Sequence, residues 1–191
     1  MGSNLPIEEI REALGQALRA GKKRIVIEAP TGSGKSTQIP QMLLEGGFLG
    51  EKGQAVILQP RRIAARMLAK RVAEERGVEL GAEVGYTIRL DDQTSGKTRI
   101  RFVTEGVLVR QMISRPKLEG VQAVICDEFH ERHLYGDLTL GRILDLQEGA
   151  RPDLLLVVMS ATLETEKLAE RIGAVILRSE GRMFPVEMHY L

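Results

Sequence analysis

Several features that identify special protein classes are scarce in this sequence. A single cysteine, Cys126, excludes an internal disulfide and fits a reducing, cytoplasmic compartment. It ends an apolar run, which predicts a buried side chain. No apolar run approaches the roughly 20 residues that a membrane-spanning helix needs, so we expect no membrane insertion. The N-terminal MGSNLPIEEI lacks a charged segment followed by an apolar one, so we expect no signal peptide there.

An excess of charge of one sign is also lacking. The chain has 27 basic and 26 acidic residues, so its formal charge of +1 gives no indication of nucleic-acid binding. The distribution of charge along the chain is more informative, because the segment PRRIAARMLAKR at 60–71 is basic and contains no acidic residue. Such a run can be an ordinary solvated helix face, so its position in the fold has to decide its role.

The pattern that is present combines short β-branched runs with longer helical segments. At 191 residues the chain has the length of one domain and can bury a core. An opening helix is expected at 6–20, with Pro6 in its first turn and Gly21 just past its end. The alternation predicts an α/β fold with a doubly wound, mostly parallel twisted sheet and helices on both faces. Expected strands lie at 24–29, 54–59, 99–104, 121–128 and 154–160, and further helices at 35–45, 61–76, 105–114, 136–147 and 164–172.

Polar clusters follow four of the expected strands. PTGSGKST follows RIVIEA, QPRR follows QAVIL, DEFH follows VQAVIC, and SAT follows LLLVVM. In open α/β sheets, ligands bind beyond the carboxyl ends of the strands. These clusters therefore lie where a functional site is expected.

The segment APTGSGKST at 29–37 resembles the Walker A phosphate-binding loop. Backbone N–H groups of a glycine-rich turn that opens a helix converge on phosphate, and the helix dipole adds positive potential. Lys35 is expected to reach the β and γ phosphates, and Ser36 to offer its hydroxyl to Mg²⁺. The predicted nucleotide-binding residues of the loop are Thr31, Gly32, Ser33, Gly34, Lys35, Ser36 and Thr37.

The stretch VICDEFHERH at 124–133 allows two interpretations. A zinc site of the H-E-x-x-H type needs histidines four residues apart, whereas His130 and His133 are three apart, which still shares one helical face. With no cysteine cluster and only His189 besides, a zinc site would depend on acids. We therefore disfavour zinc and expect His133 to be a surface or capping side chain.

The nucleotide interpretation of the same stretch accounts for its acids. A phosphate loop needs a second strand that ends in carboxylates, because Mg²⁺ at the β and γ phosphates requires an oxygen ligand from the protein. We assign Asp127 and Glu128, together with Ser36, to the Mg²⁺ site, with Asp127 as the outer partner of the metal and Glu128 also as the base that orients and deprotonates the attacking water. Lys35 completes the predicted catalytic residues.

Taken in order, GSGKST, QPRR, TEGVLVRQ, DEFH and SAT resemble motifs I, Ia, Ib, II and III of superfamily 2 helicases. The stretches VGYTIRLDDQTS, RPDLLLVVMSATLETEKLA and GRMFPVEMHY narrow the resemblance to the DEAH/RHA branch of RNA helicases, and most closely to bacterial HrpB-like helicases. It covers about residues 20–190. It departs from the general patterns at Ala29, where glycine is usual, and at Phe129, where alanine is usual. The resemblance implies a RecA-like P-loop NTPase that uses ATP or other nucleoside triphosphates with Mg²⁺.

The resemblance also implies roles outside the phosphate site. Arg71 corresponds to an arginine that stacks on the nucleotide base, which predicts a relaxed nucleotide preference. His130, Ser160 and Thr162 correspond to residues that relay the nucleotide state to the residues that contact the nucleic-acid strand. The SAT segment could instead simply end a β-strand and cap the next helix. Contacts to the sugar-phosphate backbone of a single strand, which carry no sequence information, are implied for Arg61, Arg62, Arg89, Thr104 and Glu105.

The same resemblance predicts how the chain is divided. Residues 1–20 would hold the opening helix and any residues added by cloning, 21–181 the ATP-binding lobe, and 182–191 the start of a linker to a second RecA-like lobe. In the family that second lobe carries arginine fingers, which are worth roughly 10³ to 10⁵ in rate in related systems. We therefore expect a monomeric, isolated first lobe that binds Mg-nucleotide weakly, hydrolyses it very slowly and unwinds nothing alone.

Partners and alternatives follow from these assignments. Expected partners are single-stranded nucleic acid, with RNA favoured, and the second lobe and C-terminal domains of a longer protein. One alternative is a module that uses its nucleotide state to bind a protein. Another is a P-loop ATPase that acts on DNA, because backbone contacts distinguish RNA from DNA only through the 2′-hydroxyl.

Overall fold

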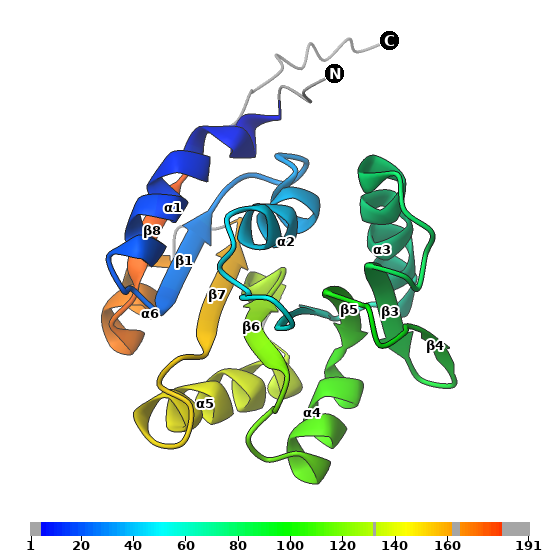
Figure 1. Cartoon of the computed structure of the whole chain (residues 1–191). Helices are drawn as coiled ribbons and strands as arrows, with labels where there is room; N and C mark the ends of the chain where they lie inside the picture. Colours follow the sequence, from blue (N-terminus) through cyan, green and yellow to red (C-terminus); the bar gives the residue numbers. More distant parts are fainter. Residues whose placement is uncertain (1–4, 132, 162–164, 181–191) are drawn as a thin grey trace, which may run out of the picture.

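The computed structural model describes residues 5–131, 133–161 and 165–180 (Figure 1). Within these ranges one eight-stranded sheet has the order β4-β3-β5-β2-β6-β7-β1-β8. Every neighbouring pair is parallel except β3 with β4, so the predicted mostly parallel sheet is confirmed. The strands are β1 (Arg24–Glu28), β2 (Gln54–Gln59), β3 (Val84–Ile88), β4 (Asp91–Gln93), β5 (Ile100–Thr104), β6 (Val121–Cys126), β7 (Leu155–Ser160) and β8 (Val175–Arg178).

Helices cover both faces of the sheet, as the sequence predicts (Figure 1). A 3-10 turn, η2 (Phe129–Glu131), follows β6. None of the described helices is long and apolar enough to cross a membrane. One face carries η1 (Pro6–Ile10), α1 (Arg11–Arg19), α2 (Lys35–Glu45) and α3 (Arg62–Arg76), and the other carries α4 (Glu105–Ser114), α5 (Leu134–Glu148) and α6 (Thr165–Ile172).

The continuous apolar runs become strands because each strand is buried on both faces. In β1, Ile25 and Ile27 point into the core cluster formed with α1, α2 and α3, whereas Val26 between them points into the cluster formed with α4, α5 and α6. All three side chains are fully buried. A strand with two apolar faces shows no alternation in its sequence, which is why the runs at β1, β2, β6 and β7 predict strands well.

Some expected elements differ in detail from the structure. The helix expected at 6–20 is a 3-10 turn followed by α1, and Gly21 lies just past its end with φ +81°. Three strands, β3, β4 and β8, were not predicted. DDQ in β4 is polar, and β3 contains a glycine, so neither has the apolar run by which strands were recognised. Cys126 is buried, as expected, and the linker expected at 182–191 lies outside the described residues.

The strand order determines which of the four polar clusters, PTGSGKST, QPRR, DEFH and SAT, lie next to one another. β7 lies between β1 and β6, so the segments that follow these three strands share one stretch of the carboxyl edge of the sheet. The segments that follow β2, β5 and β3 continue along the same edge. All four clusters therefore lie on one side of the molecule.

Candidate functional site

The loop between β1 and α2 is shaped by two glycines in the left-handed region. The φ angle is +80° at Gly32 and +92° at Gly34, conformations that cost a residue with a Cβ about 1–2 kcal/mol. The helix α2 begins at Lys35, directly after Gly34, so its N-terminal N–H groups face the loop. This is the geometry that a Walker A loop needs to hold phosphate.

The N-terminal segment braces this loop from behind. The backbone N–H of Ile7 donates a hydrogen bond to the carbonyl oxygen of Ser33 over 3.3 Å. A Cβ added at Gly34 would lie 2.8 Å from Cδ1 of Leu5, so no larger residue fits there without displacement. A larger residue at position 34 would thus be strained by the backbone angle and would also have to displace the side chain of Leu5.

One buried hydroxyl in the loop tests whether the site fits a phosphate. Ser33 is 2% exposed, and within the described part of the chain its Oγ has no hydrogen-bond partner. A buried hydroxyl that lacks a partner is costly, and a phosphate oxygen would supply the acceptor. Together with the N–H groups at the start of α2, this donor set fits the triphosphate of a nucleotide.

Lys35 reaches across the site to the residues that follow β6. Its side chain is 3% exposed, and its Nζ lies 3.3 Å from Oε1 of Glu128. Glu128 adopts φ +49°, a left-handed conformation that is uncommon for a residue with a side chain and is found at functional sites. Its backbone N–H donates to Oδ1 of Asp127 over 2.9 Å, which supports this turn. The structure thus brings the two predicted catalytic residues together.

Asp127 lies buried at the end of β6, beside the phosphate loop. Its carboxylate accepts hydrogen bonds from the hydroxyl of Ser36 and from the side-chain amide of Gln59. Burial raises the pKa of Asp127, because desolvation penalises its charged form, and the hydrogen bond from Ser36 opposes that effect. A divalent cation would stabilise the ionised carboxylate. Ser36 and Asp127 are therefore placed together as the predicted Mg²⁺ ligands require.

His130 connects the carboxylate of Glu128 with the loop that follows β7. The backbone N–H of Ala161 donates to Nδ1 of His130 over 3.4 Å, and Nε2 lies 3.3 Å from Oε2 of Glu128. When the ring is neutral, its proton is therefore on Nε2 and points to Glu128. The backbone of Ser160 is tied to the residue after β1, since Ala29 N–H donates to its carbonyl oxygen over 3.1 Å. Thr162, the third predicted relay residue, lies outside the described residues.

His133 has a different environment from His130. It occupies the N-cap position of α5, but its side chain makes no capping hydrogen bond. It is exposed, and its Nε2 lies 3.2 Å from Oε2 of Glu131. The two histidines that suggested a zinc site thus contact two different carboxylates, and His133 is a surface side chain as expected.

A cavity of about 640 Å³ joins these parts. The phosphate loop and the residues after β6 form one wall, and the start of α3 forms the opposite wall. Its volume lies within the range of small-molecule sites. The lining residues include Thr31, Gly32, Gly34, Lys35, Ser36, Thr37, Gln59, Arg61, Met67, Leu68, Asp127, Glu128 and His130.

The residues predicted to contact a nucleic-acid strand lie along the neighbouring part of the carboxyl edge of the sheet. Arg61 and Arg62 are exposed at the start of α3, and Arg89 is exposed in the turn between β3 and β4. Thr104 and Glu105 stand where β5 ends and α4 begins, and burial raises the pKa of Glu105. Since β2, β5 and β3 are neighbours, these residues form a row rather than one cluster.

Arg71, which the resemblance assigns to the nucleotide base, lies on α3. Its side chain is 65% exposed, and its Nε donates to Oε1 of Glu75 over 2.8 Å. Glu75 in turn accepts hydrogen bonds from Gln38 and Gln41 of α2. Arg71 does not line the cavity, but its helix does, through Met67 and Leu68 one turn earlier.

Comparison with known proteins identifies the family. The family model for the DEAD/DEAH box helicases matches residues 9–170. The chain belongs to the DEAD/DEAH box helicase family. This helicase domain is 45% identical over 190 residues to "ATP-dependent RNA helicase HrpB" of Escherichia coli, and 42% identical over 193 residues to "Probable ATP-dependent RNA helicase DHR2" of Saccharomyces cerevisiae. It is 44% identical over 199 residues to "Probable ATP-dependent RNA helicase DHX35" of Homo sapiens.

A solved structure agrees with these sequence relatives. The crystal structure of the Escherichia coli DEAH/RHA helicase HrpB superposes with a TM-score of 0.88 at 44% identity. The match covers 96% of the helicase domain and 23% of that chain. The sequence matches cover 98–100% of the helicase domain but only 23%, 26% and 28% of the three relatives. The helicase domain thus spans about a quarter of the proteins that it resembles, and its RecA-like α/β fold is confirmed.

Sequence reasoning missed several residues of the site. Gln59 is the first residue of QPRR, and its side-chain amide donates a hydrogen bond to the carboxylate of Asp127. A polar glutamine at the end of a buried strand could have indicated such a role. Glu131 was missed as the partner of Arg61, with 2.8 Å between Nη2 and Oε1. Nothing in the sequence pattern indicated that Leu5 and Ile7 would support the phosphate loop, because that contact depends on the tertiary fold.

Proposed function

We propose that this helicase domain is the first lobe of an ATP-dependent RNA helicase, where it binds ATP with Mg²⁺ and provides the base for hydrolysis. The observation that carries the proposal is the contact between Lys35 and Glu128 inside a cavity that also holds Ser36 and the buried Asp127. A phosphate loop, a metal carboxylate and a second carboxylate are the parts that nucleotide hydrolysis requires. The named relatives, which are ATP-dependent RNA helicases, support it.

Each residue has a chemical role in this proposal. The N–H groups at the start of α2 and the ammonium of Lys35 bind the β and γ phosphates. Ser36 and Asp127 would hold Mg²⁺ next to Glu128, where the ion would supply positive charge to the transferring phosphoryl group. Glu128 orients the attacking water and accepts its proton. His130 fixes the Glu128 carboxylate through Nε2 and connects it to the loop after β7.

We propose further that the row of residues along β2, β5 and β3 forms the path for a single strand. Arg61 and Arg62 are exposed cations at the start of α3, and Arg89 is exposed at the far end of the row. Arg61 pairs with Glu131, which lies three residues after Glu128, so the path and the catalytic segment are in direct contact. RNA is the favoured strand, in a cytoplasmic protein whose second lobe completes the site.

The experiment that tests this function uses the longer protein. ATP turnover is measured with no nucleic acid, with single-stranded RNA and with single-stranded DNA of the same sequence. We expect stimulation by RNA, loss of turnover in Glu128→Gln, and loss of stimulation alone in Arg62→Ala with Arg89→Ala, two exposed arginines that do not line the cavity. Arg19→Ala, an exposed arginine on α1, is the control and should change neither value. Turnover that survives Glu128→Gln, or that responds only to DNA, contradicts the proposal.

A further inference from the structure

Three polar side chains from two helices converge on Glu75 of α3. Nε2 of Gln38 and Nε2 of Gln41 each lie 2.9 Å from Oε2 of Glu75. Nε of Arg71 lies 2.8 Å from Oε1. The two glutamines come from α2, whereas Arg71 lies one turn earlier on α3. One carboxylate therefore fixes Arg71 relative to the helix that begins at the phosphate loop.

The glutamines depend on this carboxylate because they are buried. Gln38 and Gln41 are each 6% exposed, and buried amide donors need an acceptor. A charged carboxylate is the strongest acceptor for such donors. A glutamine in place of Glu75 would offer one acceptor oxygen instead of two and would turn an N–H₂ group towards a donor. It could not satisfy Arg71 and both glutamines at once.

Hydrogen bonds also connect the same glutamines with the phosphate loop. Nε2 of Gln38 lies 3.2 Å from Oγ1 of Thr37, and Nε2 of Gln41 donates to the carbonyl oxygen of Thr37 over 3.1 Å. The hydroxyl of Thr37 donates to the carbonyl oxygen of Gly34 over 3.1 Å. A continuous route thus runs from the loop through α2 to Glu75 and Arg71.

The phosphate end of the site has other supports. Lys35 pairs with Glu128, and Ser36 donates to Asp127, without any contribution from α3. The backbone N–H of Ile7 holds the loop at Ser33. These contacts do not involve Glu75, so loss of its carboxylate should disturb Arg71 more than it disturbs the phosphate cradle.

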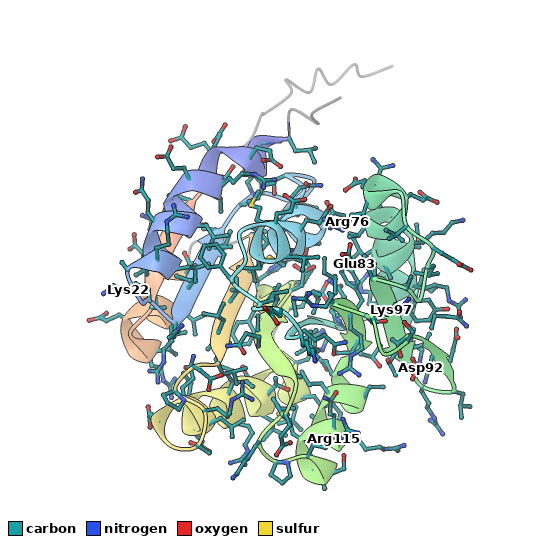
Figure 2. All side chains as sticks on the ribbon, viewed as in Figure 1. Lys22, Arg76, Glu83, Asp92, Lys97 and Arg115 are labelled. Atoms are coloured by element: carbon teal, nitrogen blue, oxygen red, sulfur yellow. The ribbon has the colours of Figure 1, made fainter. Side chains whose placement is uncertain are left out.

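The C-terminal end of α3 is also anchored separately. Nε of Arg76 lies 2.6 Å from Oε2 of Glu83, and its Nη1 lies 3.1 Å from Oε1 of Glu45. Arg76 is the last residue of α3, and Figure 2 shows Glu83 near it. Loss of the Glu75 contacts should therefore leave α3 attached to the rest of the domain.

We propose that Glu75 is a positioning residue for the nucleoside end of the bound nucleotide, an inference that rests on the proposed ATP site. The carboxylate holds Arg71 by its Nε, next to the face of α3 that lines the cavity through Met67 and Leu68. A guanidinium fixed in this way presents its planar face, which is suited to stacking on an aromatic base. Glu75 contributes to binding through the base, whereas the triphosphate is bound without it.

The test compares two ligands that differ only in the nucleoside. Kd is measured by calorimetric titration for Mg-ATP and for Mg-tripolyphosphate, in the wild-type chain and in Glu75→Gln. We expect the Kd of Mg-ATP to rise about tenfold in the variant, which corresponds to the loss of one charge-assisted hydrogen bond. The Kd of Mg-tripolyphosphate should change by less than about twofold, because the contacts of Lys35 and Ser36 remain. Glu74→Gln is the control, because Glu74 is the neighbouring residue of the same helix and contacts only the exposed Lys70 within the described residues.

A second variant separates positioning from a general structural effect. In an Arg71→Ala background, Glu75→Gln should add no further loss of ATP affinity, because the residue that it positions is absent. An equal loss for both ligands, or a full additional loss in that background, contradicts the inference and leaves the ATP site intact. A wild-type chain that binds neither ligand contradicts the proposed function and this inference with it.

Discussion

Nζ of Lys35 and Oε1 of Glu128 lie 3.3 Å apart and form an ion pair across the proposed nucleotide site. Lys35 is 3% exposed and Glu128 is 26% exposed, so the pair is partly shielded from water and its attraction is only weakly screened. An incoming triphosphate has to compete with this carboxylate for the lysine. On the proposed assignment, Glu128 therefore opposes nucleotide binding and also serves as the base for hydrolysis.

Neutralising Glu128 should separate these two effects. In Glu128→Gln, Lys35 loses its competing charge, so the Kd of Mg-ATP should fall by about two- to tenfold, the size of a partly exposed ion pair. Turnover in the longer protein should be abolished. Calorimetric titration measures the first effect, and Glu131→Gln, which removes the partner of Arg61 instead, is the control. A weaker affinity in Glu128→Gln would mean that Glu128 supports binding.

The amide of Gln59 should matter only when Mg²⁺ is present. Gln59 is 2% exposed and donates to the carboxylate of Asp127. Without this donor the carboxylate is no longer held in place for the metal, so Gln59→Leu should weaken Mg-ADP binding about tenfold. Binding of ADP in the presence of a chelator should not change. Gln54→Leu, at the other end of the same strand, is the matched control, and an equal loss with and without metal would contradict the assignment.

The contacts of His130 predict a variant that binds nucleotide but does not respond to RNA. The ring joins Glu128 to the N–H of Ala161, so among the described residues it connects the proposed catalytic carboxylate with the loop after β7. In the longer protein His130→Ala should keep its ATP affinity and lose most of the RNA stimulation of turnover. His133→Ala is the control, because His133 is exposed and contacts Glu131. Normal stimulation in His130→Ala would exclude His130 from the relay.

The single thiol provides a test of the fold itself. Cys126 is 1% exposed, and burial raises its pKa to about 12, so only about 10⁻⁴ of the native thiol is ionised at pH 8. Reaction with a thiol reagent should therefore proceed only through opening of the domain. The labelling reaction should be slow, and Mg-ATP should slow it further. Cys126 directly precedes Asp127 of the proposed site, and a bound nucleotide stabilises the folded state in which the thiol is buried. Labelling within seconds at pH 8 would contradict this burial.

The sequence predicted the centre of the sheet better than its edges. β1, β2, β6 and β7 are buried on both faces, and short continuous apolar runs that alternate with helical segments are typical of such strands. β4 is exposed and polar, and β3 is followed by an exposed turn, so their strand character comes from pairing with neighbours. Pairing is a tertiary property that local composition does not contain.

The residues of the proposed site also divide into those that local sequence predicts and those whose contacts depend on the tertiary fold. The proximity of Lys35, Ser36, Asp127 and Glu128 could be predicted, because nucleotide chemistry calls for these residue types at strand ends and the strand ends could be located. Glu75 could not, because its role depends on the distance between α2 and α3. A helical Arg71–Glu75 pair four residues apart predicts an ordinary surface ion pair, and only the structure brings Gln38 and Gln41 to the same carboxylate.

The most direct test of the proposed ATP site is calorimetric titration of Mg-ATP into this chain and into two lysine variants. Lys35→Ala removes the charge at the phosphate loop, whereas Lys22→Ala removes an exposed lysine in the turn before β1, at the opposite end of that strand (Figure 2). We predict that the wild-type chain and Lys22→Ala bind Mg-ATP equally and that Lys35→Ala binds it at least tenfold more weakly, as expected for about 1.4 kcal/mol or more. Equal affinity in all three chains would contradict the assignment of this cavity to ATP.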